Sequence, residues 1–194
     1  MINEKNIKES KERIIKLINN KEITTKNTPK YVDFFINNAN NSVDTAKILY
    51  ELSTNKDKQN ELGLTSFNGL LWVINSSYYS MFYMARALLE NQGIKINGEM
   101  SIHLVTFDAI IYFFYLTKKL EKNLIEDLIN AQEEASESLG KQKADEIIQD
   151  YLSEKIKRGR LTYEMGEIIL ESKAMTSLKR AQKFNLEIKK MILK

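Results

Sequence analysis

The chain has 194 residues, of which 43% are hydrophobic, and it contains one Pro, seven Gly and no Cys. This length suffices for one sizeable core, and the scarcity of turn-forming residues argues against an all-β protein. The absence of Cys excludes a disulfide framework, a thiol nucleophile and cysteine-ligated zinc. A formal net charge of +3 is too small to indicate nucleic-acid binding by itself, so any site for a polyanion must be a local patch.

Residues 1–27 are expected to form an N-terminal helical extension ahead of a principal domain over 28–194. Its apolar residues predict an amphipathic helix over 5–20, which the polar stretch "NNKEITTKN" follows. The first residues, "INEKNIKESKERIIK", lack the uninterrupted apolar run of a secretory signal. A cytoplasmic location is therefore expected.

Apolar residues recur at helical spacing through the principal domain, and Thr28 before Pro29 predicts an N-cap followed by a first-turn proline. The predicted helices of this domain span 29–54, 66–92, 102–116, 121–139 and 171–193, with an interruption at Gly140 and a resumed pattern over 144–152. Together with the N-terminal extension they predict an all-α bundle of four to six helices. No membrane partner is expected, because residues 70–89 include polar and charged side chains and residues 102–116 fall short of the roughly 20 needed to span a bilayer.

The predicted helix over 66–92 is apolar on two faces. One stripe at three- and four-residue steps consists of Leu71, Ile74, Tyr78, Met81, Ala85 and Leu88, and the other consists of Trp72, Tyr79, Tyr83 and Arg86. Core packing is the first interpretation of the aromatic rings, and a stacking surface for a base is the functional alternative. Because one bundle normally buries one broad face of a helix, the second stripe is expected to help cover another surface across a two-fold homodimer.

The phrase "SSYYSMFYMARALLENQGIKI", with "IHLVTFDAIIYFF" after it, resembles the central helices of the HEPN superfamily (higher eukaryotes and prokaryotes nucleotide-binding domain). The C-terminal "RGRLTYEMGEIILESKAMTSLKRAQKFNLEIKKMI" is similar to the last segment of that superfamily, so the resemblance covers about residues 29–194. It implies a four- or five-helix bundle that usually forms a homodimer. Members are metal-independent ribonucleases, often toxins paired with a small nucleotidyltransferase-like antitoxin, or non-catalytic binding and partner modules.

The ribonuclease members carry an Arg and, four to six residues later, a His that is often followed by x-Tyr. In "RGRLTYEM" the resemblance places Arg158 at the Arg position, Tyr163 at the His position and Met165 at the following Tyr. Histidine, with a pKa of about 6.5, can accept a proton from a ribose hydroxyl at neutral pH, whereas a tyrosine with a pKa of about 10 stays protonated. The ribonuclease motif is therefore degenerate.

His103 is the only histidine, and no Arg lies four to six residues before it. Its first interpretation is structural, while an auxiliary role through tertiary pairing with Arg86 or Arg158 stays open. Arg86 itself pairs with a carboxylate of a neighbouring helix in the more ordinary interpretation and binds a ligand in the other. With one histidine and no paired carboxylate motif, neither a metal site nor a cofactor is predicted.

The cations Lys155, Lys157, Arg158 and Arg160 lie within six residues, close to Tyr163. Such runs are usually solvated faces, but this one coincides with the active segment that the resemblance implies, and an arginine fork suits phosphate recognition. The candidate RNA- or phosphate-binding residues are Arg158, Arg160, Tyr163, Lys157 and Arg86, with His103, Tyr79 and Tyr83 as structural or auxiliary residues.

The sequence therefore predicts a HEPN-like binding or partner module for a nucleotide, RNA or a nucleotidyltransferase-like protein, without ribonuclease chemistry. The first alternative is an active metal-independent ribonuclease toxin of a toxin–antitoxin pair, with Tyr163 or His103 in place of the missing base. The second is a purely structural helical protein whose basic segment is a solvated surface.

Overall fold

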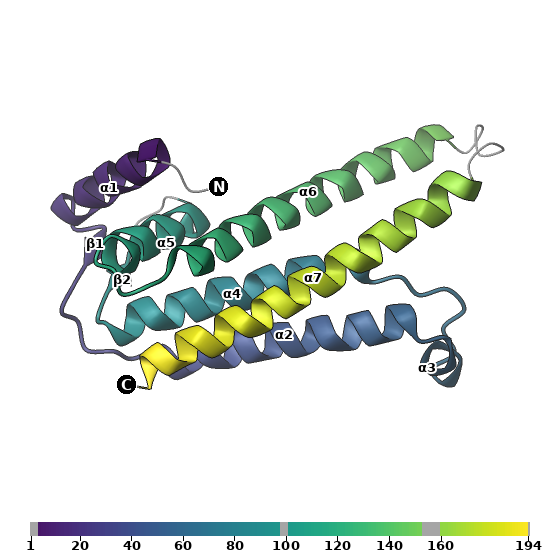
Figure 1. Cartoon of the computed structure of the whole chain (residues 1–194), viewed down its shortest axis with the longest axis horizontal. Helices are drawn as coiled ribbons and strands as arrows, with labels where there is room; N and C mark the ends of the chain where they lie inside the picture. The colour runs from purple at the N-terminus through teal and green to yellow at the C-terminus, as the bar shows by residue number, and fades with distance from the viewer. Residues whose placement is uncertain (1–3, 98–100, 153–159, 194) are drawn as a thin grey trace.

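A computed structural model describes residues 4–97, 101–152 and 160–193, with the side chains of 139–169 left undescribed. The chain is mostly helical, which confirms the prediction of an all-α bundle (Figure 1). The helices are α1 (Glu4–Asn19), α2 (Val32–Thr54), α3 (Lys56–Glu61), α4 (Leu70–Asn91), α5 (Ile102–Ile110), the π-helix η1 (Ile111–Tyr115), α6 (Lys122–Leu152) and α7 (Arg160–Ile192). A short antiparallel pairing joins β1 (Ile23–Thr24) to β2 (Lys95–Ile96).

Three helix boundaries differ from the prediction. The interruption expected at Gly140 is wrong, because α6 continues without a break to Leu152, and α7 begins at Arg160, well before the predicted start. The first turn expected at Pro29 is also wrong, because α2 begins at Val32.

The start of α2 is fixed by a carboxylate from another helix. Glu90 near the end of α4 accepts hydrogen bonds from the backbone N–H groups of Lys30 (2.8 Å) and Tyr31 (3.2 Å). A carboxylate at a helix N-terminus satisfies otherwise unpaired N–H groups and opposes the positive end of the helix dipole. This long-range contact replaces the local cap that Thr28 and Pro29 predict.

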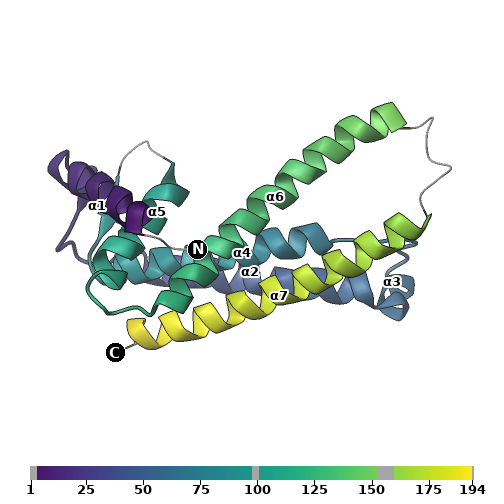
Figure 2. The ribbon, with the colours of Figure 1, turned by 45° about the horizontal axis from the view of Figure 1, so that its top comes forward.

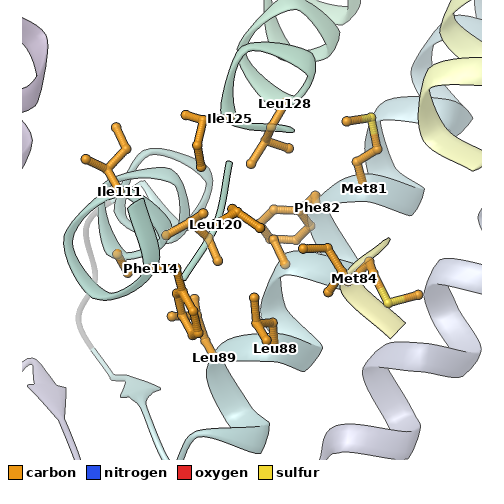
Figure 3. Packing of buried hydrophobic residues seen from close by; sticks show 14 of the residues in the cluster. Met81, Phe82, Met84, Leu88, Leu89, Ile111, Phe114, Leu120, Ile125 and Leu128 are labelled. Carbon is orange, nitrogen blue, oxygen red and sulfur yellow. The ribbon is translucent and has the colours of Figure 1, made fainter. Parts of the chain in front are cut away.

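Helix α4 is the centre of the bundle, and α2, α6 and α7 pack around it (Figures 1 and 2). Its buried side chains meet residues of η1 and α6 in the main hydrophobic cluster, as Figure 3 shows. The members labelled there are Met81, Phe82, Met84, Leu88, Leu89, Ile111, Phe114, Leu120, Ile125 and Leu128. A smaller cluster at the other end of the bundle joins α2, α4 and α7.

The N-terminal extension packs on the bundle. Ile14, Leu17 and Ile23 belong to the same buried cluster as α4, and α1 lies against α5 and η1. An ion pair between Arg13 of α1 and Asp108 of α5 fastens the contact. The extension thus completes the core on the side that carries α5.

Candidate functional site

One stripe of α4 stays open to solvent although most of this helix is buried. Trp72 is 50% exposed and Tyr79 is 40% exposed, while Tyr83 and Arg86 are half-buried. These four residues make up the second stripe of the sequence pattern, and we call them the α4 stripe. Within one chain, the bundle leaves Trp72 and Tyr79 exposed and covers part of Tyr83 and Arg86.

Tyr79 is held in place by other aromatic rings. Its ring centroid lies 5.6 Å from that of Tyr78, 6.2 Å from that of Tyr83 and 6.4 Å from that of Phe82. Tyr79 and Phe82 meet edge to face, an arrangement that the charge distribution of aromatic rings favours. The exposed ring is therefore supported from below and offers a fixed surface for stacking.

His103, on the first turn of α5, closes the same aromatic cluster. Its ring lies 4.2 Å from the ring of Phe82 and meets the Tyr79 ring at an interplanar angle of 82°. The Nδ1 atom of His103 is 2.7 Å from the hydroxyl oxygen of Tyr78. No local sequence pattern indicates this partner, which lies 25 residues away in the chain.

The protonation of the Tyr78–His103 pair follows from its burial. Burial lowers the pKa of His103, and burial together with the neighbouring Tyr79 raises the pKa of the Tyr78 phenol. At neutral pH the tyrosine is protonated and the histidine is neutral, and the direction of the hydrogen bond between them depends on which ring nitrogen carries the proton. The arrangement fits the structural interpretation of His103.

Arg86 lies at the other side of the α4 stripe, next to α2. Its guanidinium carbon is 5.0 Å from the ring centroid of Phe35, which is a cation–π contact. Burial lowers the pKa of Arg86, and the charge of Glu90 opposes this shift. The Nη1 atom is buried, and no described group is within hydrogen-bonding distance of it. Packing against Phe35, rather than an ion pair, therefore holds this arginine among the described residues.

The predicted site residues are only partly brought together. Tyr79, Tyr83 and His103 share one aromatic cluster, whereas Arg86 faces α2, and no hydrogen bond joins Arg86 to His103 in the described part of the chain. Lys157 and Arg158 lie outside the described residues. Arg160 and Tyr163 lie on the first turns of α7, and their side chains are outside the described set.

Two polar features near the site escaped the sequence analysis. Asp108 is the one acidic residue in the apolar run "IHLVTFDAIIYFF", and this isolation was a usable signal that it has a specific partner. The other feature is a buried chain in which Asn185 of α7 donates to the hydroxyl of Ser80, and Ser80 donates to the carbonyl of Ala39. It connects α7, α4 and α2 in the interior of the bundle.

No group of three or more His, Cys, Asp or Glu residues that could hold a metal ion occurs among the described side chains. In the part of the chain that the structure covers, no helix has both the length and the apolar character to cross a membrane. No family model matches the chain, and no curated protein or solved structure shows significant similarity to it.

Proposed function

We propose that the chain is a HEPN-like binding or partner module that uses the α4 stripe for a nucleotide, RNA or a nucleotidyltransferase-like protein and lacks ribonuclease chemistry. The observation that carries this proposal is the exposure of Trp72 and Tyr79 on a helix that is otherwise mostly buried. Contact between an aromatic ring and water is unfavourable, and removing the ring from water under a binding partner contributes favourably to the free energy of binding.

Single-stranded RNA is a ligand that suits these side chains. Every base offers a flat surface that can stack on an aromatic ring, and this contact does not depend on the base sequence. Tyr79 supplies such a ring with a fixed orientation, and Arg86 adds positive charge at the edge of the same stripe. The basic residues Arg158 and Arg160 are proposed to bind the phosphates.

The state of His103 supports a function without catalysis. A general base must present a free nitrogen to the reacting hydroxyl and needs a group to stabilise the charge that develops. Nδ1 of His103 is hydrogen-bonded to Tyr78, and no hydrogen bond among the described residues brings the Arg86 guanidinium, which packs on Phe35, to this ring. In the motif that the HEPN resemblance implies, Tyr163 stands at the position of the histidine, and a tyrosine is a poor base at neutral pH.

A homodimer across the α4 stripe is the alternative use of the same surface, because a ring buried between two copies cannot also stack on a base. Trp72 and Tyr79 are half exposed, so each can bury about 100 Å² of the roughly 200 Å² that a large aromatic side chain carries. Phe34 (58% exposed) of α2 contacts Phe35, which packs on Arg86 of the stripe, and Tyr31 (56% exposed) lies at the start of the same helix, so both can add similar areas. These four side chains give about 400 Å², which is half of the roughly 800 Å² per partner in a standard interface.

Incubation of the purified chain with a fluorescent single-stranded RNA in EDTA tests the function. Binding is followed by anisotropy and cleavage by gel electrophoresis. We expect binding that weakens with salt, no cleavage, and a Tyr79→Ala variant that loses about 1 to 3 kcal/mol of binding free energy, the usual contribution of one stacked base. Leu62→Ala is the matched control, because Leu62 is 62% exposed on the distant turn after α3.

Two results would overturn the proposal in different directions. Cleavage in EDTA that Arg158→Ala abolishes would establish the ribonuclease alternative. Binding that is undetectable for RNA and nucleotides at low salt, in a chain that light scattering shows to be monomeric, would favour the purely structural alternative.

A further inference from the structure

A second surface shares no residue with the α4 stripe. An open cavity of about 450 Å³ lies between α5 and α6, next to the beginning of α1. Leu104 and Phe107 of α5 and Ile129 of α6 provide its apolar lining, and each of the three is only partly buried. We call this cavity the α5–α6 groove.

The ionisable side chains that line the α5–α6 groove are both acidic. Glu133 and Glu137 of α6 are exposed, and no described side chain forms an ion pair with either of them. Residues four apart on a helix lie one above the other, so the two carboxylates form a negative edge one turn long. The groove thus combines an apolar lining with a negative rim.

The neighbouring face of α6 shows what this combination binds within the chain itself. There Glu134 contacts Arg180 of α7 at 2.8 Å, and Asp127 contacts Arg180 at 3.7 Å and Lys183 at 3.3 Å. The apolar residues Leu128, Ala131 and Ala135 of α6 are buried beside these pairs. An acidic edge of α6 therefore already pairs with basic residues of α7, a helix that packs chiefly on α4.

We propose that the α5–α6 groove docks a basic amphipathic helix of a partner protein, whose cations pair with Glu133 and Glu137 as those of α7 pair with Asp127 and Glu134. Charge complementarity selects a cationic partner, and the apolar lining selects a helix with large apolar side chains on one face. This proposal does not depend on RNA binding by the α4 stripe, none of whose residues lines the groove.

The dimensions of the groove define the partner helix. From Ile129 to Glu137 the axis of α6 advances about 12 Å, which is slightly more than two helical turns. The partner therefore needs apolar residues three or four positions apart, and two Lys or Arg residues four positions apart to match Glu133 and Glu137. A helix of this kind contributes about eight residues to the contact.

A synthetic peptide with these features tests the proposal on the full chain. The probe is a fluorescein-labelled helix of about 16 residues, because shorter isolated helices are only marginally stable in water. It carries leucines at three- and four-residue spacing beside two lysines four positions apart, and its binding is measured by fluorescence anisotropy. We expect saturable binding that weakens when the leucines are replaced by alanine or when the lysines are replaced by glutamate.

Two variants of the chain locate the site. Replacing both carboxylates, Glu133→Gln with Glu137→Gln, should weaken binding roughly three- to tenfold, which is the combined effect of two exposed ion pairs. The exposed Ser136 also lines the groove, and Ser136→Trp should abolish binding by filling it. The matched control is Asp57→Asn with Glu61→Gln, which removes the same charge from two exposed residues four apart on α3.

Circular dichroism verifies that each variant remains folded. We expect this result because all of the changed side chains are exposed. The proposal is overturned if the probe does not bind the wild-type chain at about 1 mM, an affinity equivalent to only about 4 kcal/mol. It is also overturned if the α3 control weakens binding as much as the Glu133 and Glu137 variant, or if the alanine version of the probe binds as tightly as the leucine version. Either result would mean that general charge attraction, and not the groove, holds the peptide.

Discussion

The ion pair between Arg13 and Asp108 provides the sharpest test of how the N-terminal extension is held. The Nε atom of Arg13 donates to one carboxylate oxygen of Asp108 at 2.7 Å, and Nη2 donates to the other at 3.0 Å. Asp108 is fully buried, and it has no other side-chain partner in the described part of the chain. Arg13→Ala would therefore leave a buried carboxylate without a counter-charge.

The size of the effect follows from the unequal exposure of the two partners. Removing one partner of a fully buried pair costs about 3 to 5 kcal/mol, because the remaining charge is desolvated and unpaired. The side chain of Arg13 is 36% exposed, so water can reach Asp108 once the guanidinium is gone. We therefore expect Arg13→Ala to lower the free energy of unfolding by about 2 to 3 kcal/mol, somewhat less than for a fully buried pair.

Urea denaturation at pH 7, followed by far-UV circular dichroism, measures this loss. A thermal melt should agree, with a decrease in Tm of about 4 to 12 °C for a domain of this size. Arg13→Lys should fall in between, because it keeps the charge but cannot form the paired hydrogen bonds. Glu9→Ala is the control, since Glu9 lies 3.9 Å from Arg13 in an exposed pair, and it should cost less than about 0.5 kcal/mol. A loss below about 0.5 kcal/mol for Arg13→Ala would refute the reasoning.

Three further predictions concern the pH dependence, the backbone and the oligomeric state. Burial lowers the pKa of His103 in the folded chain, so the unfolded chain binds a proton at a higher pH than the folded chain does. The contribution of neutral His103 to the free energy of unfolding is therefore fully present above about pH 6.5 and is lost as the pH decreases through the folded pKa. Urea denaturation midpoints measured between pH 7 and pH 5 should show this decrease. Gly93→Ala should cost about 2 kcal/mol or more in urea denaturation, because Gly93 has φ +66° and a Cβ there would lie 2.4 Å from the carbonyl oxygen of Asn27. Tyr83→Glu should convert the proposed dimer to a monomer in light scattering at micromolar concentration, because it places a charge in the proposed interface.

Each of these predictions has a control within the chain. His103→Asn removes the titrating ring but keeps a hydrogen-bonding group near Tyr78, and a wild-type pH profile parallel to that of this variant would contradict the assignment. Gly63→Ala has a similar φ of +68° but nothing within 4 Å of the added Cβ, so it should cost less than Gly93→Ala. Leu62→Glu, on the distant turn after α3, should leave the dimer intact. A wild-type monomer, or a Tyr83→Glu variant that stays dimeric, would remove the dimer proposal.

The sequence was sufficient for the elements whose apolar residues follow a long, regular period. The helix predicted over 5–20 is α1, and most of the helices predicted over 29–54 and 66–92 are α2 and α4. It was insufficient at Gly140, where a glycine was expected to stop the helix. A glycine inside a helix costs only about 1 kcal/mol relative to alanine, and good helix formers on both sides can offset this in α6.

The site was less accessible to sequence reasoning because its contacts are long-range. The exposure of the α4 stripe could be predicted, because the sequence of α4 is apolar on two faces and one bundle normally buries one broad face of a helix. The partner of His103 could not be inferred in this way, because Tyr78 meets it only after α4 and α5 pack together. The same holds for Glu90, whose carboxylate fixes the start of α2 from a position 60 residues away in the chain.

Helix α5 connects both proposed surfaces. His103 on its first turn packs against the aromatic cluster beside the α4 stripe, and Leu104 and Phe107 line the α5–α6 groove. The next residue, Asp108, is fixed to α1 by the ion pair with Arg13. Since these side chains belong to little more than one helical turn, a rotation or shift of α5 would move the wall of the groove and the ring of His103 together. The extension that holds Asp108 therefore stabilises the positions of both surfaces as well as the fold. A weaker ion pair in a folded Arg13→Lys chain should let α5 shift, so this chain should bind both the single-stranded RNA and the helical peptide more weakly than the wild-type chain does.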